Sequence, residues 1–180
     1  MTNRIKTVQN PRLILAVCQN ARRISEILSD ILNDCSYNTC IDSFHKNTDF
    51  IISTKSKAEC PNDVIPDTII FDESTDKNIA DKAVNAFKKK VTSYEHFYSA
   101  NEDEQMSVIT YSLDNYSADV TFRNIKEENG ITVFDVIVNG ILGRVRVNST
   151  LYSLKEVLQC IAVLTATGVP LAPITSFFNA

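Results

Sequence analysis

The chain has 180 residues, a net charge of −4 and only four glycines, the first of them at position 130. Glycine-dependent phosphate loops, whether GxGxxG or GxxxxGK[ST], are therefore excluded from the first 129 residues, because both motifs need glycine to let backbone N–H groups close on phosphate. The acidic balance argues against a nucleic-acid partner, and the lack of any apolar run near ~18 residues argues against a membrane span.

The first half alternates short apolar runs with helical periodicity, which predicts a parallel sheet with helical crossovers. The predicted strands are residues 13–17, 50–52 and 68–71. The first of them is a continuous apolar run, typical of a strand buried on both faces. Apolar spacing also predicts amphipathic helices over residues 24–32 and 79–87. The second helix is expected to end in the lysine run 88–90, because cations suit a helix C-terminus.

The second half is predicted to be mostly strands separated by turn residues. The expected strands are residues 107–111, 119–125, 131–138 and 142–147. Residues 128–130 and the pair Asn139-Gly140 are hairpin signals, and Gly143 is expected to mark a bulge or bend in the last strand. A helix with one apolar face follows over residues 154–165, and Gly168 ends it as a C-cap.

These patterns predict a single domain over residues 1–180 with an α/β fold in three layers. The sheet is expected to be mostly parallel, with an antiparallel strand region in the second half. Residues 11–100 would form the parallel α/β part, residues 107–150 the antiparallel strands and residues 151–178 the closing helices. No internal repeat, low-complexity tract or linker indicates a second domain.

An ordered set of short motifs spans residues 107–178. In chain order these motifs are Val108-Ile109-Thr110-Tyr111, Ala118-Asp119, Asn124-Ile125, the Gly130 hairpin, the strand 134–138 and a helix that ends in Gly168-Val169. Their order and spacing resemble the central, ATP-binding domain of the Mur ligase family, the ATP-dependent amide ligases of peptidoglycan precursor synthesis. They look most like the UDP-N-acetylmuramoyl-peptide ligases that add the third residue, and residues 100–103 look like the family's N-x-D-D segment. The resemblance implies a P-loop-NTPase-like fold.

Extended backward, the resemblance places the family's phosphate loop at residues 18–25. Where the family has T-G-T-N-G-K-T-T, Gln19 and Arg22 replace both glycines and Arg23 stands at the lysine. Side chains at the glycine positions obstruct the approach of the backbone to phosphate, and an arginine fork is bulkier than the compact lysine charge. The degenerate phosphate-loop positions are Gln19, Asn20, Arg22, Arg23 and Ser25.

The positions that the resemblance assigns to magnesium and adenine differ as well. Ser53 stands at the family's magnesium-binding glutamate and supplies no anionic ligand. At the start of the last helix, the family's G-x-x-N-x-x-N contacts adenine; here residues 150–156 contain neither asparagine, and Ser153 and Glu156 occupy the contact positions. The departures thus gather on the phosphate, magnesium and adenine contacts, while the scaffold positions persist.

Local alternatives remain at the charged positions. Arg22-Arg23 fits either an anion site at a helix N-terminus or two solvated arginines, and the second is favoured because cations oppose the macrodipole there. Residues 101–104 fit a cation site or an acidic solvated loop. The carboxylates of Asp72-Glu73 with Asp76 fit a magnesium site or the N-cap of the following helix.

Cysteine and histidine give no sign of catalysis or metal binding. The five cysteines form no CxxC pair and the two histidines are isolated, which predicts reduced thiols and no metal ligands. Catalysis by Cys60 with His45 or His96 is formally possible, but nothing in the sequence brings them together, so no catalytic residue is assigned. The polar N-terminus lacks a signal-peptide core, and a cytoplasmic protein is expected.

Three functional hypotheses follow. The leading one is a non-catalytic Mur-ligase-like domain, a pseudoenzyme or partner subunit without a cofactor, acting with a protein partner or as a homo-oligomer. The alternative is an ATP-dependent peptide ligase, or part of a split one, that uses ATP and magnesium together with a partner that supplies the other domains. The third is a module that binds another small molecule at the strand C-termini, near Cys18, Ser53 and Asp72.

Overall fold

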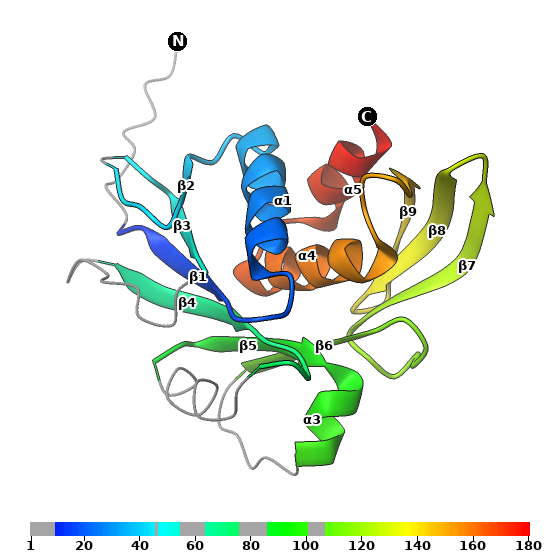
Figure 1. The fold of residues 1–180 in the computed structure, drawn as a ribbon, viewed down its shortest axis with the longest axis horizontal. Helices are drawn as coiled ribbons and strands as arrows, with labels where there is room; N and C mark the ends of the chain where they lie inside the picture. Colours follow the sequence, from blue (N-terminus) through cyan, green and yellow to red (C-terminus); the bar gives the residue numbers. More distant parts are fainter. Residues whose placement is uncertain (1–9, 46, 55–63, 76–85, 101–106) are drawn as a thin grey trace.

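A nine-stranded mixed sheet forms the centre of the computed structural model, which describes residues 10–45, 47–54, 64–75, 86–100 and 107–180 (Figure 1). In chain order the strands are β1 (Arg12–Ala16), β2 (Thr39–Ile41), β3 (Phe50–Ser53), β4 (Ile65–Ile70), β5 (Lys89–Ser93), β6 (Ser107–Ser112), β7 (Val120–Glu128), β8 (Ile131–Val138) and β9 (Ile141–Asn148). The helices are α1 (Ala21–Asp34), α3 (Tyr94–Ala100), α4 (Leu154–Thr167) and α5 (Leu171–Asn179). The strands lie in the order β2-β3-β1-β4-β5-β6-β7-β8-β9.

The parallel part of the sheet extends further than the sequence predicts. β6 pairs in parallel with β5, and the start of β7 pairs in parallel with the end of β6. Only β8 runs against the other described strands, and it does so between β7 and β9. The antiparallel region therefore begins at Val120 and not at residue 107. The reason is that a crossover containing α3 joins β5 to β6, and such a connection leads to parallel pairing.

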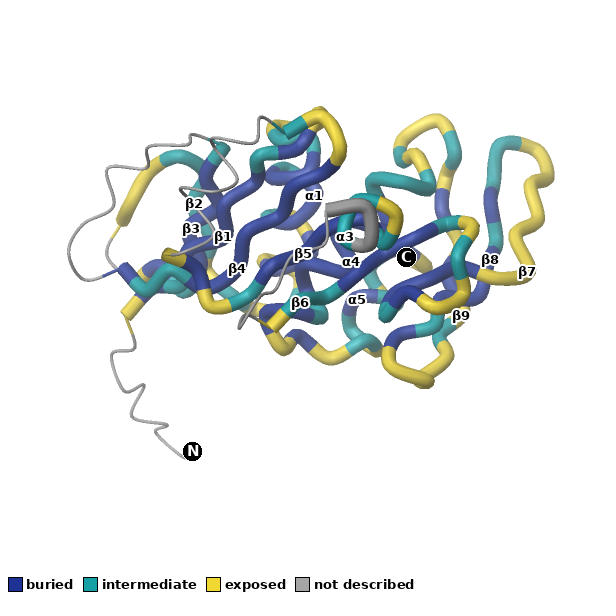
Figure 2. The backbone as a smooth tube through the Cα atoms, turned by 90° about the horizontal axis from the view of Figure 1, so that it is seen from below, coloured by how far each residue is buried: buried dark blue, intermediate teal, exposed yellow. Residues whose placement is uncertain are grey.

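Helices cover both faces of the sheet, which confirms the predicted three-layer α/β fold. α1, α4 and α5 lie on one face, and α3 lies on the other (Figure 1). Alternate residues of β1 belong to two different cores. Ile14 and Ala16 share a core with α1 and α4, whereas Leu13 and Leu15 pack with Ile69 on the opposite face. β1 is thus buried on both faces, as its apolar run predicts, and Figure 2 traces that burial along β1, β3 and β4.

The predicted final helix is confirmed as α4, but its burial differs from the prediction. The sequence indicates one apolar face, whereas every residue from Val157 to Leu164 is buried. α1, α5 and four strands pack around the helix, so only positions near its ends are partly exposed. Gly168 has a φ of 85°, and the Val169 N–H donates to the Leu164 carbonyl 2.9 Å away. The predicted glycine C-cap is therefore confirmed.

Two cations hold the C-terminal end of α4 against the N-terminal edge of the sheet. Arg12 Nη2 donates to the Thr167 carbonyl at 2.7 Å and to Asp67 Oδ2 at 2.6 Å. Lys89 Nζ donates to the Ala166 carbonyl at 2.5 Å. Positive charge at this end complements the helix macrodipole, and the buried Asp67 carboxylate forms ion pairs with both cations.

Two of the three lysines in the run 88–90 belong to a strand rather than to the end of a helix. Lys89 and Lys90 belong to β5, and Lys90 is buried with its ammonium 4.6 Å from the centre of the Phe71 ring. Lysine tolerates such a place because its aliphatic stem packs on apolar surface. The helix that the sequence predicts over residues 79–87 lies almost wholly outside the described residues. The sequence also did not indicate β2 or α3.

Asparagine shares the turn positions with glycine in this glycine-poor chain. Asn129 and Gly130 have φ of 52° and 76°, and Asn139 and Gly140 have φ of 48° and 80°. Two successive left-handed residues are typical of type I′ hairpin turns, in which asparagine is the best-tolerated partner of glycine. Both predicted hairpins, β7–β8 and β8–β9, are confirmed.

Gly143 makes room for a helix and does not mark a bulge. The β8–β9 register is continuous through this position, so the predicted bulge is wrong. A Cβ placed on Gly143 would lie 2.9 Å from Thr175 Cγ2 and 3.3 Å from Leu171 Cδ2, both on α5. Glycine therefore allows α5 to lie close against β9.

The last turn of α5 is hydrogen-bonded to the outer edge of β9. Asn179 Oδ1 accepts the Arg146 N–H at 2.7 Å, and its Nδ2 donates to the Arg144 carbonyl at 3.0 Å. One side-chain amide thereby binds a donor and an acceptor of the edge strand.

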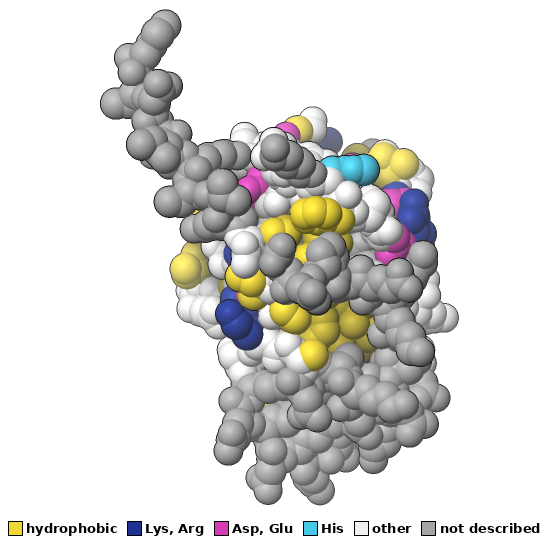
Figure 3. Space-filling model, turned by 90° about the vertical axis from the view of Figure 1, so that its left-hand side faces the viewer, with side chains coloured by type: hydrophobic (Ala, Val, Ile, Leu, Met, Phe, Trp, Pro, Cys, Tyr) yellow, Lys and Arg dark blue, Asp and Glu magenta, His cyan; other side chains and the backbone are white. Residues whose placement is uncertain are grey.

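One face of the surface is apolar at its centre. Viewed toward the left-hand side of Figure 1, hydrophobic side chains gather there, while Lys and Arg side chains lie in separate places (Figure 3). Among the described helices, none has the length and apolar character needed to cross a membrane.

Candidate functional site

The predicted phosphate-loop positions begin in a short connection between β1 and α1. Residues 17–20 join the two elements, and none of residues 17–25 has a positive φ. The Ala21 N–H donates to the Cys18 carbonyl at 3.1 Å, which closes the turn. This backbone needs no glycine, which explains how Gln19 and Arg22 fit here.

A buried carboxylate joins this connection to the end of β4. Asp72 is 1% exposed, and its Oδ2 accepts the Gln19 N–H at 3.3 Å. The Thr75 hydroxyl adds a second link by donating to the Val17 carbonyl at 2.5 Å. β1 and β4 are neighbours whose following strands, β2 and β5, lie on opposite sides of them. In open α/β sheets, ligands bind at such a point, so Asp72 stands where a ligand is expected.

The predicted anion-binding side chains do not converge. Arg22 Nε bonds to Glu26 at 3.0 Å on the exposed face of α1. Arg23 Nη2 donates to the Leu151 carbonyl at 2.8 Å. Ser25 is fully buried, and its hydroxyl donates to the carbonyl of Ala21 in its own helix at 2.8 Å. Each of the three side chains thus contacts protein.

The predicted adenine positions form a helix cap. The Ser153 Oγ accepts the Glu156 N–H at 3.2 Å, and Glu156 Oε2 accepts the Ser153 N–H at 3.0 Å. This reciprocal capping box starts α4. Asn20 Nδ2 also lies 3.5 Å from Glu156 Oε1, so the structure brings one phosphate-loop position next to one adenine position.

Ser53, at the position of the family's magnesium ligand, contacts an aspartate that the sequence did not single out. Its hydroxyl donates to Asp42 Oδ1 at 3.1 Å, and the Thr54 N–H donates to the same oxygen at 2.8 Å. Asp42 follows β2, a strand that the sequence did not predict. Within the described ranges, no group of three or more His, Cys, Asp or Glu side chains could hold a metal ion.

The cysteine thiol at the end of β1 is chemically quiet. Burial raises the pKa of Cys18 to about 12, and the Asp72 carboxylate adds to the rise. Burial also raises the pKa of Cys160, on α4. Both thiols are free, as are the thiols of Cys35 and Cys40. The prediction of reduced thiols agrees with these four cysteines, while Cys60 lies outside the described residues.

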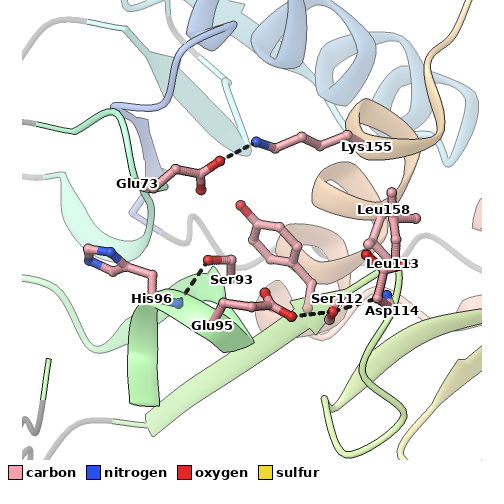
Figure 4. A pocket seen from close by; sticks show the side chains of 10 residues that line it. Glu73, Ser93, Glu95, His96, Ser112, Leu113, Asp114, Lys155 and Leu158 are labelled. Atoms are coloured by element: carbon pink, nitrogen blue, oxygen red, sulfur yellow. Dashed lines mark hydrogen bonds and ion pairs between the residues drawn. The ribbon is translucent and has the colours of Figure 1, made fainter. Parts of the chain in front are cut away.

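A cavity of about 400 Å³ opens beyond the C-terminal ends of β4, β5 and β6 (Figure 4). Its polar lining includes Glu73, Ser93, Glu95, Ser112, Asp114 and Lys155. Lys155 Nζ bonds to Glu73 Oε1 at 2.7 Å, and this bond raises the pKa of Lys155 and lowers the pKa of Glu73. His96 also lines the cavity. The sequence analysis had considered Glu73 for magnesium and His96 for catalysis, but it did not place them together. The useful signal would have been polar residues just after each strand.

No protein-family model matches the chain, and neither does any curated protein. Solved structures do match it. A UDP-N-acetylmuramoyl-L-alanyl-D-glutamate–2,6-diaminopimelate ligase aligns over 96% of this chain with 14% identity and a TM-score of 0.71. The chain has the Mur-ligase fold. The resemblance found in the sequence and the predicted fold class are both confirmed as far as the fold is concerned.

Two further ligases have the same Mur-ligase fold. The MurF ligase from Thermotoga maritima, solved in complex with ADP, aligns over 93% of this chain with 11% identity and a TM-score of 0.63. Folylpolyglutamate synthetase from Lactobacillus casei aligns over 94% with 11% identity and a TM-score of 0.60. This chain spans 47% of the diaminopimelate ligase, 48% of the MurF ligase and 62% of the synthetase, so it is about half the length of the Mur ligases it matches.

Proposed function

We propose that this chain is a non-catalytic Mur-ligase-like domain that does not bind magnesium-ATP and acts by binding, either to a protein partner or to a second copy of itself. The observation that carries the proposal is the contact between Asp72 and the Gln19 N–H. A phosphate site after a strand depends on free backbone N–H groups that point at the anion. Here one of these N–H groups is bonded to a carboxylate, whose charge repels phosphate.

The other positions expected to contact the nucleotide support the same proposal. Ser53 is hydrogen-bonded to Asp42, and Ser153 and Glu156 cap each other at the start of α4. Arg23, at the position of the loop lysine, is bonded to the Leu151 carbonyl. Binding magnesium-ATP in the family's manner would require several of these contacts to break together.

Titration of the full chain with magnesium-ATP tests the proposal. A ligand at 100 times its Kd stabilises a protein by about 2.7 kcal/mol, so about 5 mM ATP would raise Tm by several degrees if Kd were ~50 μM. We expect a shift below about 1 °C and no saturable heat in calorimetry. Binding in the micromolar range would overturn the proposal and favour an ATP-dependent peptide ligase, or part of one.

The Asp72→Asn variant separates the carboxylate charge from the rest of the site. Asparagine keeps the size of the side chain and an oxygen that can accept the Gln19 N–H. Weak ATP binding that appears in this variant and is absent from the wild type would identify charge as the barrier. If neither protein binds ATP, the barrier to binding lies in the β1–α1 connection (residues 17–20) and in the hydrogen-bonded side chains around it. The proposal stands in either case.

A further inference from the structure

We propose that the cavity at the ends of β4, β5 and β6 binds a small organic cation that carries a primary ammonium group on a short hydrocarbon stem. The inference rests on the proposed function, because it assigns a ligand to a domain that binds without catalysis. The cavity's volume of about 400 Å³ lies in the range of small-molecule sites.

The charge of the lining selects a cation. Three carboxylates, those of Glu73, Glu95 and Asp114, and one lysine, Lys155, line the cavity, and these four side chains together carry a formal charge of −2. The lysine is already bonded to Glu73, at 2.7 Å. Neither Glu95 nor Asp114 forms an ion pair with a described residue. Among the described residues neither carboxylate has a cationic partner, so the lining favours a cation over an anion.

One of these carboxylates is held in place before any ligand arrives. The Ser112 hydroxyl donates to Glu95 Oε1 at 2.6 Å (Figure 4). The same hydroxyl oxygen accepts the N–H groups of Asp114 and Asn115, at 3.2 and 3.0 Å, which directs its proton toward Glu95. No described residue is hydrogen-bonded to the other oxygen of Glu95, which can accept an ammonium group. A preoriented acceptor reduces the ordering cost of binding.

The remaining lining suits the stem of such a ligand. Tyr111, Leu113 and Leu158 provide aromatic and aliphatic surface next to the carboxylates. Tyr111 is 2% exposed, and its oxygen accepts a hydrogen bond from Gln159 Nε2 at 2.9 Å. Burial, together with the Asp72 and Glu73 carboxylates, raises the pKa of Tyr111, so the phenol stays neutral beside a cation.

The carboxylates suit an organic cation better than a metal ion. No set of three acidic, histidine or cysteine side chains in the described part of the chain converges on a point as metal ligands would. Glu95 and Asp114 instead line the same cavity as the apolar side chains of Leu113 and Leu158. An ammonium group with a carbon stem uses both kinds of surface.

The test compares three probes of equal length: n-butylamine, n-butanol and butyrate. Calorimetry and amide NMR shifts on the full chain should give saturable n-butylamine binding with shifts at the ends of β5 and β6. n-Butanol and butyrate should bind at least about tenfold more weakly, since they lack a charge-assisted bond to a carboxylate. No n-butylamine binding, or butyrate binding with the same shifts, would overturn the inference.

Two substitutions locate the binding. Glu95→Gln should weaken n-butylamine binding about tenfold or more, while Glu128→Gln, on the distant β7–β8 hairpin, should leave it within about twofold. Asp114→Asn is the second cavity variant if Glu95→Gln does not fold. Equal affinity in wild type and cavity variants would refute the site. The magnesium-ATP titration fails or succeeds independently, so the two proposals are distinguishable.

Discussion

Replacing Gly143 by alanine measures how closely α5 lies against β9. The new Cβ would lie 2.9 Å from Thr175 Cγ2, where ordinary contacts begin at 3.4 Å, and 3.3 Å from Leu171 Cδ2. Overpacking of this kind costs about 1–3 kcal/mol, and the reduced freedom of the unfolded chain returns about 0.4–1 kcal/mol. We therefore expect a net loss of about 1 kcal/mol, or roughly 2–4 °C in Tm for a chain of this size.

A second substitution identifies the atom responsible. Thr175→Ser removes Cγ2 and keeps the hydroxyl, which donates to the Ala172 carbonyl at 2.9 Å. In the Thr175→Ser background, Gly143→Ala should be neutral or stabilising, because the nearest contact is gone. Urea unfolding of all four proteins, followed by circular dichroism, gives the coupling free energy, expected at about 0.5–2 kcal/mol. A loss on Gly143→Ala that is the same in both backgrounds would refute the reasoning.

Two further predictions concern ion pairs between a buried aspartate and a more exposed arginine. Hydrogen bonds from Arg144 and Asn124 lower the pKa of Asp135, so its contribution to stability is present at neutral pH and is lost as the pH falls through about 4 and below. Urea unfolding at several pH values should show that acidification lowers the free energy of unfolding less for Asp135→Asn than for wild type. Equal decreases in the two proteins would contradict this. Arg12→Met removes the donor to Asp67 and to the last carbonyl of α4. It should lower the free energy of unfolding by about 2 kcal/mol. A decrease under about 0.5 kcal/mol would mean that Lys89 alone is enough to hold the end of α4.

Local patterns in the sequence predict the elements that local forces determine. The apolar run of β1, the two hairpins and the glycine cap of α4 each depend on a few adjacent residues, and all are confirmed. β5 is different, because its lysines, read alone, indicate the C-terminal end of a helix. Lys89 is placed by the end of α4, which follows 77 residues later, and no local pattern carries that information.

The candidate site follows the same distinction. Ser153 and Glu156 have the S-x-x-E spacing of a capping box, so their structural role could be read from the sequence. The Gln19–Asp72 contact joins positions 53 residues apart, and the Glu95–Ser112 bond joins positions 17 apart. Both depend on which strands become neighbours in the sheet. The sequence therefore predicts which positions depart from a nucleotide site, but not what they bind instead.

The hydrogen bonds between Asn179 of α5 and the edge strand β9 affect how the protein can associate with other chains. An edge strand exposes unpaired N–H and C=O groups, which form a template for strand addition and aggregation. Along β9, the Asn179 amide covers the N–H of Arg146 and the carbonyl of Arg144, much as a neighbouring strand would. Another chain could pair with these two backbone groups only by displacing the last turn of α5, so this part of the edge is protected against strand addition.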